Sequence, residues 1–241
     1  MLKQDAITPL YVQLMEELET SIRNGVYKPG DKIMTEAEIA KEYGVSLITV
    51  RKAVGSLMEK GLVVRKQGKG TFVTKPKYSR NMKKLQSFTE MCEQMGVKPG
   101  AQVLENRLIM ADKKVADRLG IEPGSNVVYI SRLRLADGEP VQVEKSYFPL
   151  KYAFLLEEDL NNGSMFECLK EKAGAKVASS EKMIELCRAT AEEAALMDVK
   201  KGDYLLFVKS TAYDENGEPM YAGIQLINGD RFSLYVYESG K

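Results

Sequence analysis

The chain of 241 residues, 44% of them hydrophobic and 29% charged, is long enough for two domains of ordinary size. Its formal net charge is +1, no apolar run approaches the roughly 20 residues of a membrane-spanning helix, and its start lacks a signal-peptide layout, so we expect a cytoplasmic protein. It contains no histidine, which excludes histidine-based metal sites and catalytic triads, and its three scattered cysteines are typical of buried thiols in a reducing compartment. We therefore expect neither a metal nor a cofactor.

Three helices are predicted in the first 60 residues. Apolar residues at helical spacing across 10–22 indicate the first helix. Thr35 and Glu38 have the spacing of a capping box, which begins a second, short helix, and Gly44 suits its left-handed end. A third helix follows over residues 46–60. Two short helices joined by a glycine turn are the layout of a helix-turn-helix.

The third helix and the residues after it complete this pattern. Ser46 is its expected cap. Its expected buried face consists of Val50, Ala53, Val54, Leu57 and Met58. A strand at 62–65, a basic glycine-rich turn at 66–70 and a returning strand at 71–73 predict a hairpin. A hairpin directly behind a helix-turn-helix is a wing, so the sequence predicts a winged helix-turn-helix.

The charge of the chain is concentrated in this region. Residues 44–77 carry eight basic side chains and one acidic side chain, whereas residues 78–241 carry 22 and 25. A small basic region is typical of a protein that binds a polyanion such as double-stranded DNA, although an ordinary solvated surface gives the same count. A helix of this kind fits the major groove with its N-terminal side chains against base edges.

The first part of the chain resembles the DNA-binding domain of the GntR family. The motifs that carry the resemblance are Pro9-Leu10-Tyr11, Lys28-Pro29-Gly30-Asp31, Thr35-Glu36, Val45-Ser46, Thr49-Val50-Arg51-Lys52-Ala53 and Gln67-Gly68-Lys69-Gly70-Thr71-Phe72-Val73. The resemblance and the helix geometry together imply DNA contacts from Thr35, Ser46, Thr49, Arg51, Lys52, Gln67, Gly68, Lys69 and Gly70. Ala37 and Leu47 stand where the family commonly has arginines that touch the operator, so the operator sequence does not carry over.

The predicted secondary structure changes along the chain, from mainly helical to strands alternating with short helices, and this change divides the chain into two domains. Residues 1–74 form the expected DNA-binding domain, 75–83 a linker and 84–241 a second domain. Residues 115–148 and 193–228 form a faint repeat of helix, glycine turn, strand, hairpin and strand. Two such units can join into one antiparallel sheet with helices on one face, which makes the fold class α+β. The Asp137-Gly138 and Asn216-Gly217 pairs favour type I′ hairpin turns.

The repeat also indicates a candidate site. Arg132 and Arg134 lie two apart on a predicted strand and share a face, whereas the second copy has Ser210 and Ala212 at these positions. Two arginines on one face can form a fork for phosphate, sulfate or carboxylate, or they can be solvated edge residues. Glu144 can orient them or bind the ligand, or it can be a surface carboxylate.

These features resemble the UTRA ligand-binding domain of HutC-like GntR regulators, whose fold is similar to chorismate lyase. The markers are Leu85-Gln86-Ser87-Phe88-Thr89, Arg132-Leu133-Arg134, Glu144 and Gly229-Asp230-Arg231-Phe232. Read without the resemblance, Ser87 or Thr89 is simply the cap of a helix. The resemblance implies a ligand site built from Ser87, Phe88, Thr89, Arg132, Arg134, Glu144, Ser164, Phe166 and Tyr221.

The anion-binding positions of members that answer to phosphorylated amino sugars are matched, but the sugar-reading positions differ. Phe166 replaces a tyrosine, Tyr221 a carboxylate and Ile227 a tyrosine. We therefore expect a small anionic metabolite such as a sugar phosphate, bound by a homodimeric repressor that leaves a near-palindromic operator. Two alternatives are a ligand-independent regulator whose second domain binds proteins, and a lyase-like enzyme, which the lack of a convincing base or nucleophile array disfavours.

Overall fold

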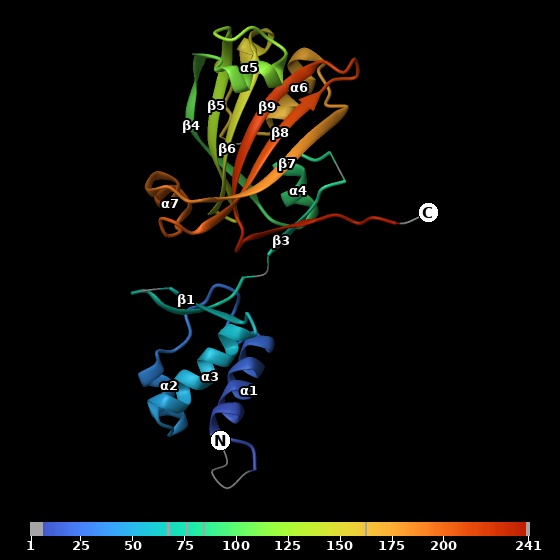
Figure 1. Cartoon of the computed structure of the whole chain (residues 1–241). Helices are drawn as coiled ribbons and strands as arrows, with labels where there is room; N and C mark the ends of the chain where they lie inside the picture. The colour runs from blue at the N-terminus through green and yellow to red at the C-terminus, as the bar shows by residue number, and fades with distance from the viewer. Residues whose placement is uncertain (1–6, 67, 76, 84, 162, 240–241) are drawn as a thin grey trace. The chain divides into compact units, whose positions relative to one another are not determined.

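The protein consists of two compact units, residues 1–76 and 77–241, in the computed structural model (Figure 1). The structure describes residues 7–66, 68–75, 77–83, 85–161 and 163–239. Within these ranges no helix has both the length and the apolar character needed to cross a membrane. Each unit has its own hydrophobic core, and each is described separately below.

The first unit is the predicted winged helix-turn-helix. Its elements are α1 (Leu10–Arg23), α2 (Glu36–Tyr43), α3 (Leu47–Glu59), β1 (Val63–Lys66) and β2 (Gly70–Val73). The two strands pair antiparallel as the wing. The predicted capping box is present, because the Thr35 hydroxyl accepts from the Glu38 amide and the Glu38 side chain accepts from the Thr35 amide. Gly44 ends α2 with a φ of 64°, the left-handed conformation that glycine adopts without strain.

The core of this unit forms where α1 and α3 pack together. Leu14 and Leu18 of α1 are buried against Val50, Val54 and Leu57 of α3. Met58 was expected on this face, but its side chain is 39% exposed. The correction follows from helix geometry, because Met58 is rotated by one residue, about 100°, from Leu57 and lies at the rim of the buried face.

The second unit is built on a six-stranded antiparallel sheet. Its strands in spatial order are β4 (Pro99–Met110), β5 (Asn126–Ala136), β6 (Glu139–Pro149), β9 (Pro219–Asn228), β8 (Tyr204–Tyr213) and β7 (Ser179–Arg188). The β5–β6 hairpin comes from the first copy of the predicted repeat and the β8–β9 hairpin from the second, and β6 pairs with β9 where the copies meet. The predicted α+β class is therefore confirmed.

Helices lie on both faces of this sheet, whereas the sequence led us to expect them on one. The repeat helices α5 (Lys113–Leu119) and α7 (Ala191–Met197) share one face, as predicted. The other face packs against α4 (Phe88–Gln94), the 3-10 helix η1 (Leu150–Leu156) and α6 (Met165–Ala173) (Figure 1). The physical reason is that β5 carries apolar residues on both sides, Val128 and Ile130 on one and Val127 and Leu133 on the other, so that both of its faces are buried.

The two hairpin turns differ, although their sequences are alike. Asp137 and Gly138 have φ values of 51° and 79°, as a type I′ turn requires. In the second hairpin Gly217 has a φ of 80° but Asn216 does not have a positive φ. There the Asp214 carboxylate accepts from the Asn216 amide at 2.8 Å and the Gly217 amide donates to the Asp214 carbonyl at 3.1 Å. The expectation of a second type I′ turn was wrong, because the Asp214 side chain shapes a longer turn.

A short parallel pair ties the start of the second unit to its end. Strand β3 (Tyr78–Asn81) falls within the segment expected to be a linker, and it pairs with β10 (Phe232–Tyr235). The Tyr78 and Phe232 ring centroids are 5.2 Å apart, and Phe232 also lies 6.4 Å from Phe88 of α4. Residues 78–81 thus belong to the fold of the second unit, and they bring β3 next to α4.

Replacement of Phe232 tests this anchor. Phe232→Ala removes a ring that is buried against Tyr78 and Phe88, and we expect it to lower the free energy of unfolding by about 3–5 kcal/mol. Urea denaturation of the full chain, followed by tyrosine fluorescence, measures the change. Tyr235→Ala, on the same strand but half exposed, is the control and should change stability by less than about 0.5 kcal/mol. Equal effects would show that β10 is not anchored through Phe232.

Candidate functional site

The N-terminal end of α3 presents the expected DNA-contacting residues. Ser46 caps the helix: its hydroxyl oxygen accepts from the Thr49 amide at 3.2 Å and lies 2.9 Å from the Thr49 hydroxyl. Leu47 and Ile48 follow the cap and are exposed, Ile48 at 77%. Where the family commonly has arginine, this helix therefore offers apolar side chains, which in a major groove suit thymine methyl groups.

An acidic residue of α2 organises the basic side chains around it. Glu36 accepts from Arg51 Nε at 2.9 Å and also pairs with Arg65 of β1. Lys52 Nζ lies 3.8 Å from the centroid of the Tyr11 ring of α1. Arg51 is thus held at the exposed surface of α3, whereas Lys52 packs back onto its own domain. Sequence analysis missed Arg65, whose only signal was its place at the end of a predicted strand.

The wing has the backbone geometry that its glycines predict. Gly68 and Gly70 have φ values of 73° and 120°, and Lys69 between them is exposed. A side chain at Gly70 would place its Cβ 2.5 Å from Lys32 Cε. Gln67, the remaining expected contact at the tip, lies outside the described residues. Thr35 is exposed, and its hydroxyl lies 2.8 Å from Glu38 Oε2, so its capping role occupies that group.

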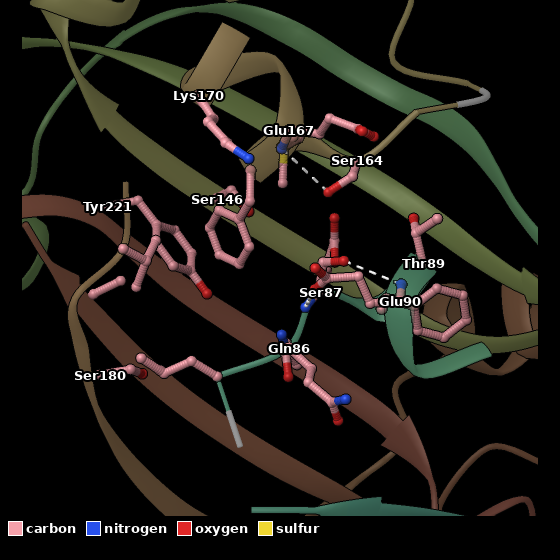
Figure 2. A pocket seen from close by; sticks show the side chains of 18 of the residues that line it. Gln86, Ser87, Thr89, Glu90, Ser146, Ser164, Glu167, Lys170, Ser180 and Tyr221 are labelled. Carbon is pink, nitrogen blue, oxygen red and sulfur yellow. Dashed lines mark hydrogen bonds between the residues drawn. The ribbon is translucent and has the colours of Figure 1, made fainter. Parts of the chain in front are cut away.

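The second unit contains a cavity of about 520 Å³ on the sheet face that α4 and α6 cover (Figure 2). All nine residues of the expected ligand site line it. They are Ser87, Phe88, Thr89, Arg132, Arg134, Glu144, Ser164, Phe166 and Tyr221. Residues from α4, from α6 and from the central strands therefore converge, as the resemblance implied.

Strand register brings the charged residues together. Arg132 and Arg134 lie on one face of β5, and Arg132 is opposite Glu144 of β6, which is in turn opposite Gln225 of β9. The alternatives in which the arginines are solvated and Glu144 is a surface carboxylate are wrong, because these three side chains are only 2–6% exposed.

Arg132 is fully engaged by the protein. Its Nε donates to Glu144 Oε1 at 2.8 Å, and one terminal nitrogen also pairs with that carboxylate. The other terminal nitrogen donates to the carbonyls of Leu160 and Gly163 at 3.1 and 3.2 Å. The two arginines therefore do not act together as the expected anion fork. Arg132 instead joins β5 to β6 and to the loop that leads into α6.

Arg134 has hydrogen-bond donors that no group in the described part of the chain accepts. One terminal nitrogen donates to Thr89 Oγ1 at 3.3 Å, and the guanidinium carbon lies 4.5 Å from the centroid of the Phe88 ring. Its Nε and other terminal nitrogen are buried and have no hydrogen-bond partner in the described part of the chain. Burial, together with the charge of Arg132, lowers the pKa of Arg134 to about 10, so the group stays charged at neutral pH. A buried cation with unmet donors is costly unless an anion completes it.

Glu144 balances part of this charge. Its burial opposes ionisation, but the positive charges of Arg132 and Arg134 outweigh that effect and hold the pKa of the carboxyl below its ordinary value. Gln142 donates a further hydrogen bond to Glu144 Oε2 at 3.4 Å. Glu144 is therefore an ionised acceptor in the floor of the cavity, and it faces more than one cation.

Two helix caps face the cavity from α4 and α6. The Ser87 hydroxyl accepts from the Glu90 amide at 3.2 Å, and the Ser164 hydroxyl accepts from the Glu167 amide at 3.4 Å (Figure 2). The two helices have similar places in the chain, because each comes directly before an edge strand of the sheet: α4 before β4 and α6 before β7. Both serines use the hydroxyl oxygen as an acceptor, which leaves each hydroxyl proton available to a bound molecule.

Aromatic residues form the opposite wall. The Tyr221 hydroxyl lies 2.9 Å from the Ser210 hydroxyl, and its ring stacks on Phe148 and meets Phe166 edge-on, with centroids 5.6 and 5.4 Å apart. A Cβ at Gly223 would fall 2.5 Å from Tyr221 Cε2, so glycine there leaves room for the ring. This end of the cavity offers a ring face and a neutral hydroxyl in place of a carboxylate.

Several lining residues were not anticipated from the sequence. They are Arg80, Ser146, Ser180, Lys182 and Gln225. Arg80 fell within the expected linker, and its Nη1 donates to Gln225 Oε1 at 3.1 Å. Arg80 and Lys182 reach the cavity from β3 and β7, which flank it in space but have no shared sequence pattern.

Comparison with known proteins places the chain in a family. The family model "Bacterial regulatory proteins, gntR family" matches residues 10–73, and "UTRA domain" matches residues 94–233, more than half of the chain. The chain belongs to the GntR family of bacterial regulators and carries a UTRA domain. Its winged helix-turn-helix is the DNA-binding part of such a regulator, and its UTRA domain is the part that binds a small ligand.

Relatives along the whole chain are described as transcription regulators. The "Uncharacterized HTH-type transcriptional regulator YurK" of Bacillus subtilis is 35% identical over 98% of both chains. The "HTH-type transcriptional repressor NagR" of the same organism is 34% identical over 98% of this chain and 96% of that protein. Among solved structures, PhnF of Mycobacterium smegmatis has a TM-score of 0.68 and 26% identity, covering 95% of this chain and all of that one. The GntR-family chain is thus a regulator, and the enzyme alternative is dropped.

The central ion pair gives a prediction on stability. Glu144→Gln leaves the guanidinium groups around it without a counter-charge, and we expect the free energy of unfolding to fall by about 3–5 kcal/mol at pH 7. Because the pKa of Glu144 is lowered in the folded state, its stabilisation is complete above the ordinary pKa and is lost as the pH falls through the lower folded value. The difference from wild type should therefore be constant between pH 6 and 7.5 and shrink below the ordinary value of 4.5.

Urea denaturation at a series of pH values measures this difference. Glu93→Gln is the matched control, because Glu93 also lines the cavity but is exposed; its effect should stay within about 0.5 kcal/mol at every pH. A pH-independent loss in Glu144→Gln would mean that packing, and not the ionised carboxylate, stabilises this region.

The recognition helix of the GntR domain gives a prediction on DNA binding. Arg51→Ala should weaken binding to the duplex that wild type selects from a random pool by about 1–3 kcal/mol, which is about 5–150-fold, because a base-edge contact is lost. Fluorescence anisotropy at fixed salt measures it. Arg23→Ala removes an equally exposed arginine, paired with Glu19 on α1, and should leave affinity unchanged. If both variants bind alike, Arg51 does not read the operator.

Proposed function

We propose that this GntR-family protein is a homodimeric repressor that leaves its operator when a small anionic metabolite, such as a sugar phosphate, binds in the UTRA cavity. Relatives named as repressors support the sign of regulation. The observation that carries the ligand class is the buried Arg134 guanidinium, two of whose nitrogens have no partner among the described residues.

The rest of the cavity suits a phosphorylated sugar. Its volume of about 520 Å³ lies in the ordinary range for small-molecule sites. Thr89 and the Ser87 cap stand beside Arg134 and offer hydroxyl groups to a phosphate. Phe166 and Tyr221 offer ring faces to the sugar. Since Tyr221 holds the position of a carboxylate, we propose a ligand without an amine at that end.

On DNA, we propose that each protomer places α3 in the major groove of one half-site and its wing against the backbone. Thr49 and Arg51 would contact base edges, and Ser46, Gly68, Lys69 and Gly70 would position the domain on phosphates. Thr35, Lys52 and Gln67 complete the proposed set. A dimer with two-fold symmetry then requires an operator with two half-sites in inverted orientation.

Ligand and operator binding must be coupled for release to occur. A coupling free energy of about 1–3 kcal/mol would change DNA affinity about 5–150-fold, and operator DNA would weaken ligand binding by the same factor. This reciprocity is a strict requirement. A ligand that saturates the cavity without any effect on operator affinity would contradict the proposal.

The test removes the cation that defines the ligand class. A thermal-shift screen of the purified protein against sugar phosphates, sugar acids, phosphate and sulfate should give a hit, since a ligand at 100 times its Kd adds about 2.7 kcal/mol of stability. Arg134→Gln should abolish that shift and the release of operator DNA. Without ligand the variant should be at least as stable as wild type, because it no longer buries an unmatched charge.

Lys114→Gln is the control for this test, because Lys114 is exposed on α5, on the sheet face away from the cavity. It should respond like wild type. A normal response in Arg134→Gln would rule out the anion site. If no anion raises the melting temperature of the wild type while operator binding is intact, the alternative in which the second domain binds a protein partner is favoured.

A further inference from the structure

A second group of cations faces the cavity, apart from Arg134. Arg80 reaches in from β3 and Lys182 from β7, both half-buried. Arg80 donates to Gln225 Oε1 at 3.1 Å and to the Gln86 carbonyl at 3.4 Å. Ser180, two residues before Lys182 on the same face of β7, also lines the cavity. These residues form a polar corner, which we call the Arg80–Lys182 corner.

The corner has no counter-charge of its own. Within the described ranges neither Arg80 nor Lys182 forms a salt bridge. Both hydrogen bonds of Arg80 go to neutral amide oxygens. Burial and the nearby charge of Arg80 both lower the pKa of Lys182, so the two cations repel each other across a partly desolvated space.

The cavity as a whole also carries more positive than negative charge. Three guanidinium groups, those of Arg80, Arg132 and Arg134, act on a single buried carboxylate, Glu144. That carboxylate is already engaged by Arg132. The other acidic residues that line the cavity are exposed: Glu90, Glu93 and Glu167. Two buried guanidinium groups and the half-buried Arg80 therefore face one buried carboxylate, an excess of two positive charges before Lys182 is counted. The exposed Lys170 and Lys176 line the cavity as well.

The excess positive charge of the cavity lies at two separate places. Arg134 is on β5 and Lys182 on β7, with β6, β9 and β8 between them. Neighbouring strands lie about 4.8 Å apart, so four strand spacings separate the backbones of Arg134 and Lys182 across this twisted sheet. Figure 2 shows Ser180 and Tyr221 on the side of the cavity away from Thr89, the partner of Arg134. Arg134 is held beside Thr89 and Lys182 stands with Ser180, so a molecule with an acidic group at each end can engage both places.

We propose that the metabolite carries two acidic groups, one bound by Arg134 with Thr89 and the other by the Arg80–Lys182 corner. This rests on the proposed function and narrows the ligand to phosphorylated sugar acids or sugar bisphosphates. The hydroxyl groups of Ser146 and Tyr221 also line the cavity and suit the sugar, and Ser180 belongs to the corner. Arg80 of the corner lies on β3, the first strand of the second unit.

The deciding experiment uses selenate as an anion probe whose position can be read from anomalous diffraction. Crystals of the full-length protein are soaked in sodium selenate. Two selenate ions per cavity are expected in wild type, one at Arg134 and one at the corner. Arg134→Gln should keep only the corner ion, and Lys182→Gln should keep only the Arg134 ion. Lys182→Arg, which keeps the charge, should retain both.

The possible results separate the two proposals. One selenate at Arg134 alone would overturn this inference and leave the proposed function standing. Selenate at neither place would contradict both. Lys182→Gln is preferred to Arg80→Gln as the first variant, because Lys182 lies on an edge strand and the described residues show no side-chain hydrogen bond from it that its loss would break.

Affinities then measure what the second group contributes. Glucose 6-phosphate is compared with 6-phosphogluconate, and fructose 6-phosphate with fructose 1,6-bisphosphate, by calorimetry on the full chain. In a pair that binds, the doubly acidic member should bind about tenfold tighter to wild type and to Lys114→Gln, whose lysine is exposed on α5 away from the cavity. That advantage should vanish in Lys182→Gln, while the singly acidic member keeps its affinity. Equal losses for both members would overturn the inference.

Discussion

The buried pair between Arg132 and Glu144 is the interaction on which the ligand domain depends. It joins β5 to β6 at the floor of the cavity, and the same guanidinium holds the carbonyls of Leu160 and Gly163. Those bonds fix the loop that ends at Ser164, where α6 begins. A saturated arginine thus positions one wall of the cavity and leaves its neighbour, Arg134, to face the space without a full set of partners.

The repeat explains how one fold supplies both scaffold and site. The two copies share their helices, glycine turns and strand pairs, and they meet where β6 pairs with β9. They differ at positions that face the cavity, where Arg132 and Arg134 in one copy correspond to Ser210 and Ala212 in the other. The shared residues fold the sheet, while the differing ones place cations at one end and small or hydroxyl side chains at the other. Unmatched charge in this cavity costs stability that an anion would restore.

The first strand of the second unit lines the same cavity. β3 pairs with β10 and brings Arg80 to the cavity beside Gln225. On the DNA side, Glu36 holds Arg51 and Arg65 together, while exposed Leu47 and Ile48 replace charge with apolar surface at the start of α3.

The amino-acid sequence by itself determined the features that depend on residues a few positions apart. The Thr35–Glu38 capping box, the wing glycines and the common face of Arg132 and Arg134 follow from local spacing, because caps, turns and strand alternation are local rules. Only the tertiary structure decided that Arg132 is saturated and Arg134 is not, that helices cover both sheet faces, that β3 pairs with β10, and that Arg80 and Lys182 share a cavity. These outcomes depend on which distant groups meet and on how many partners each charge finds, and no short-range pattern encodes that.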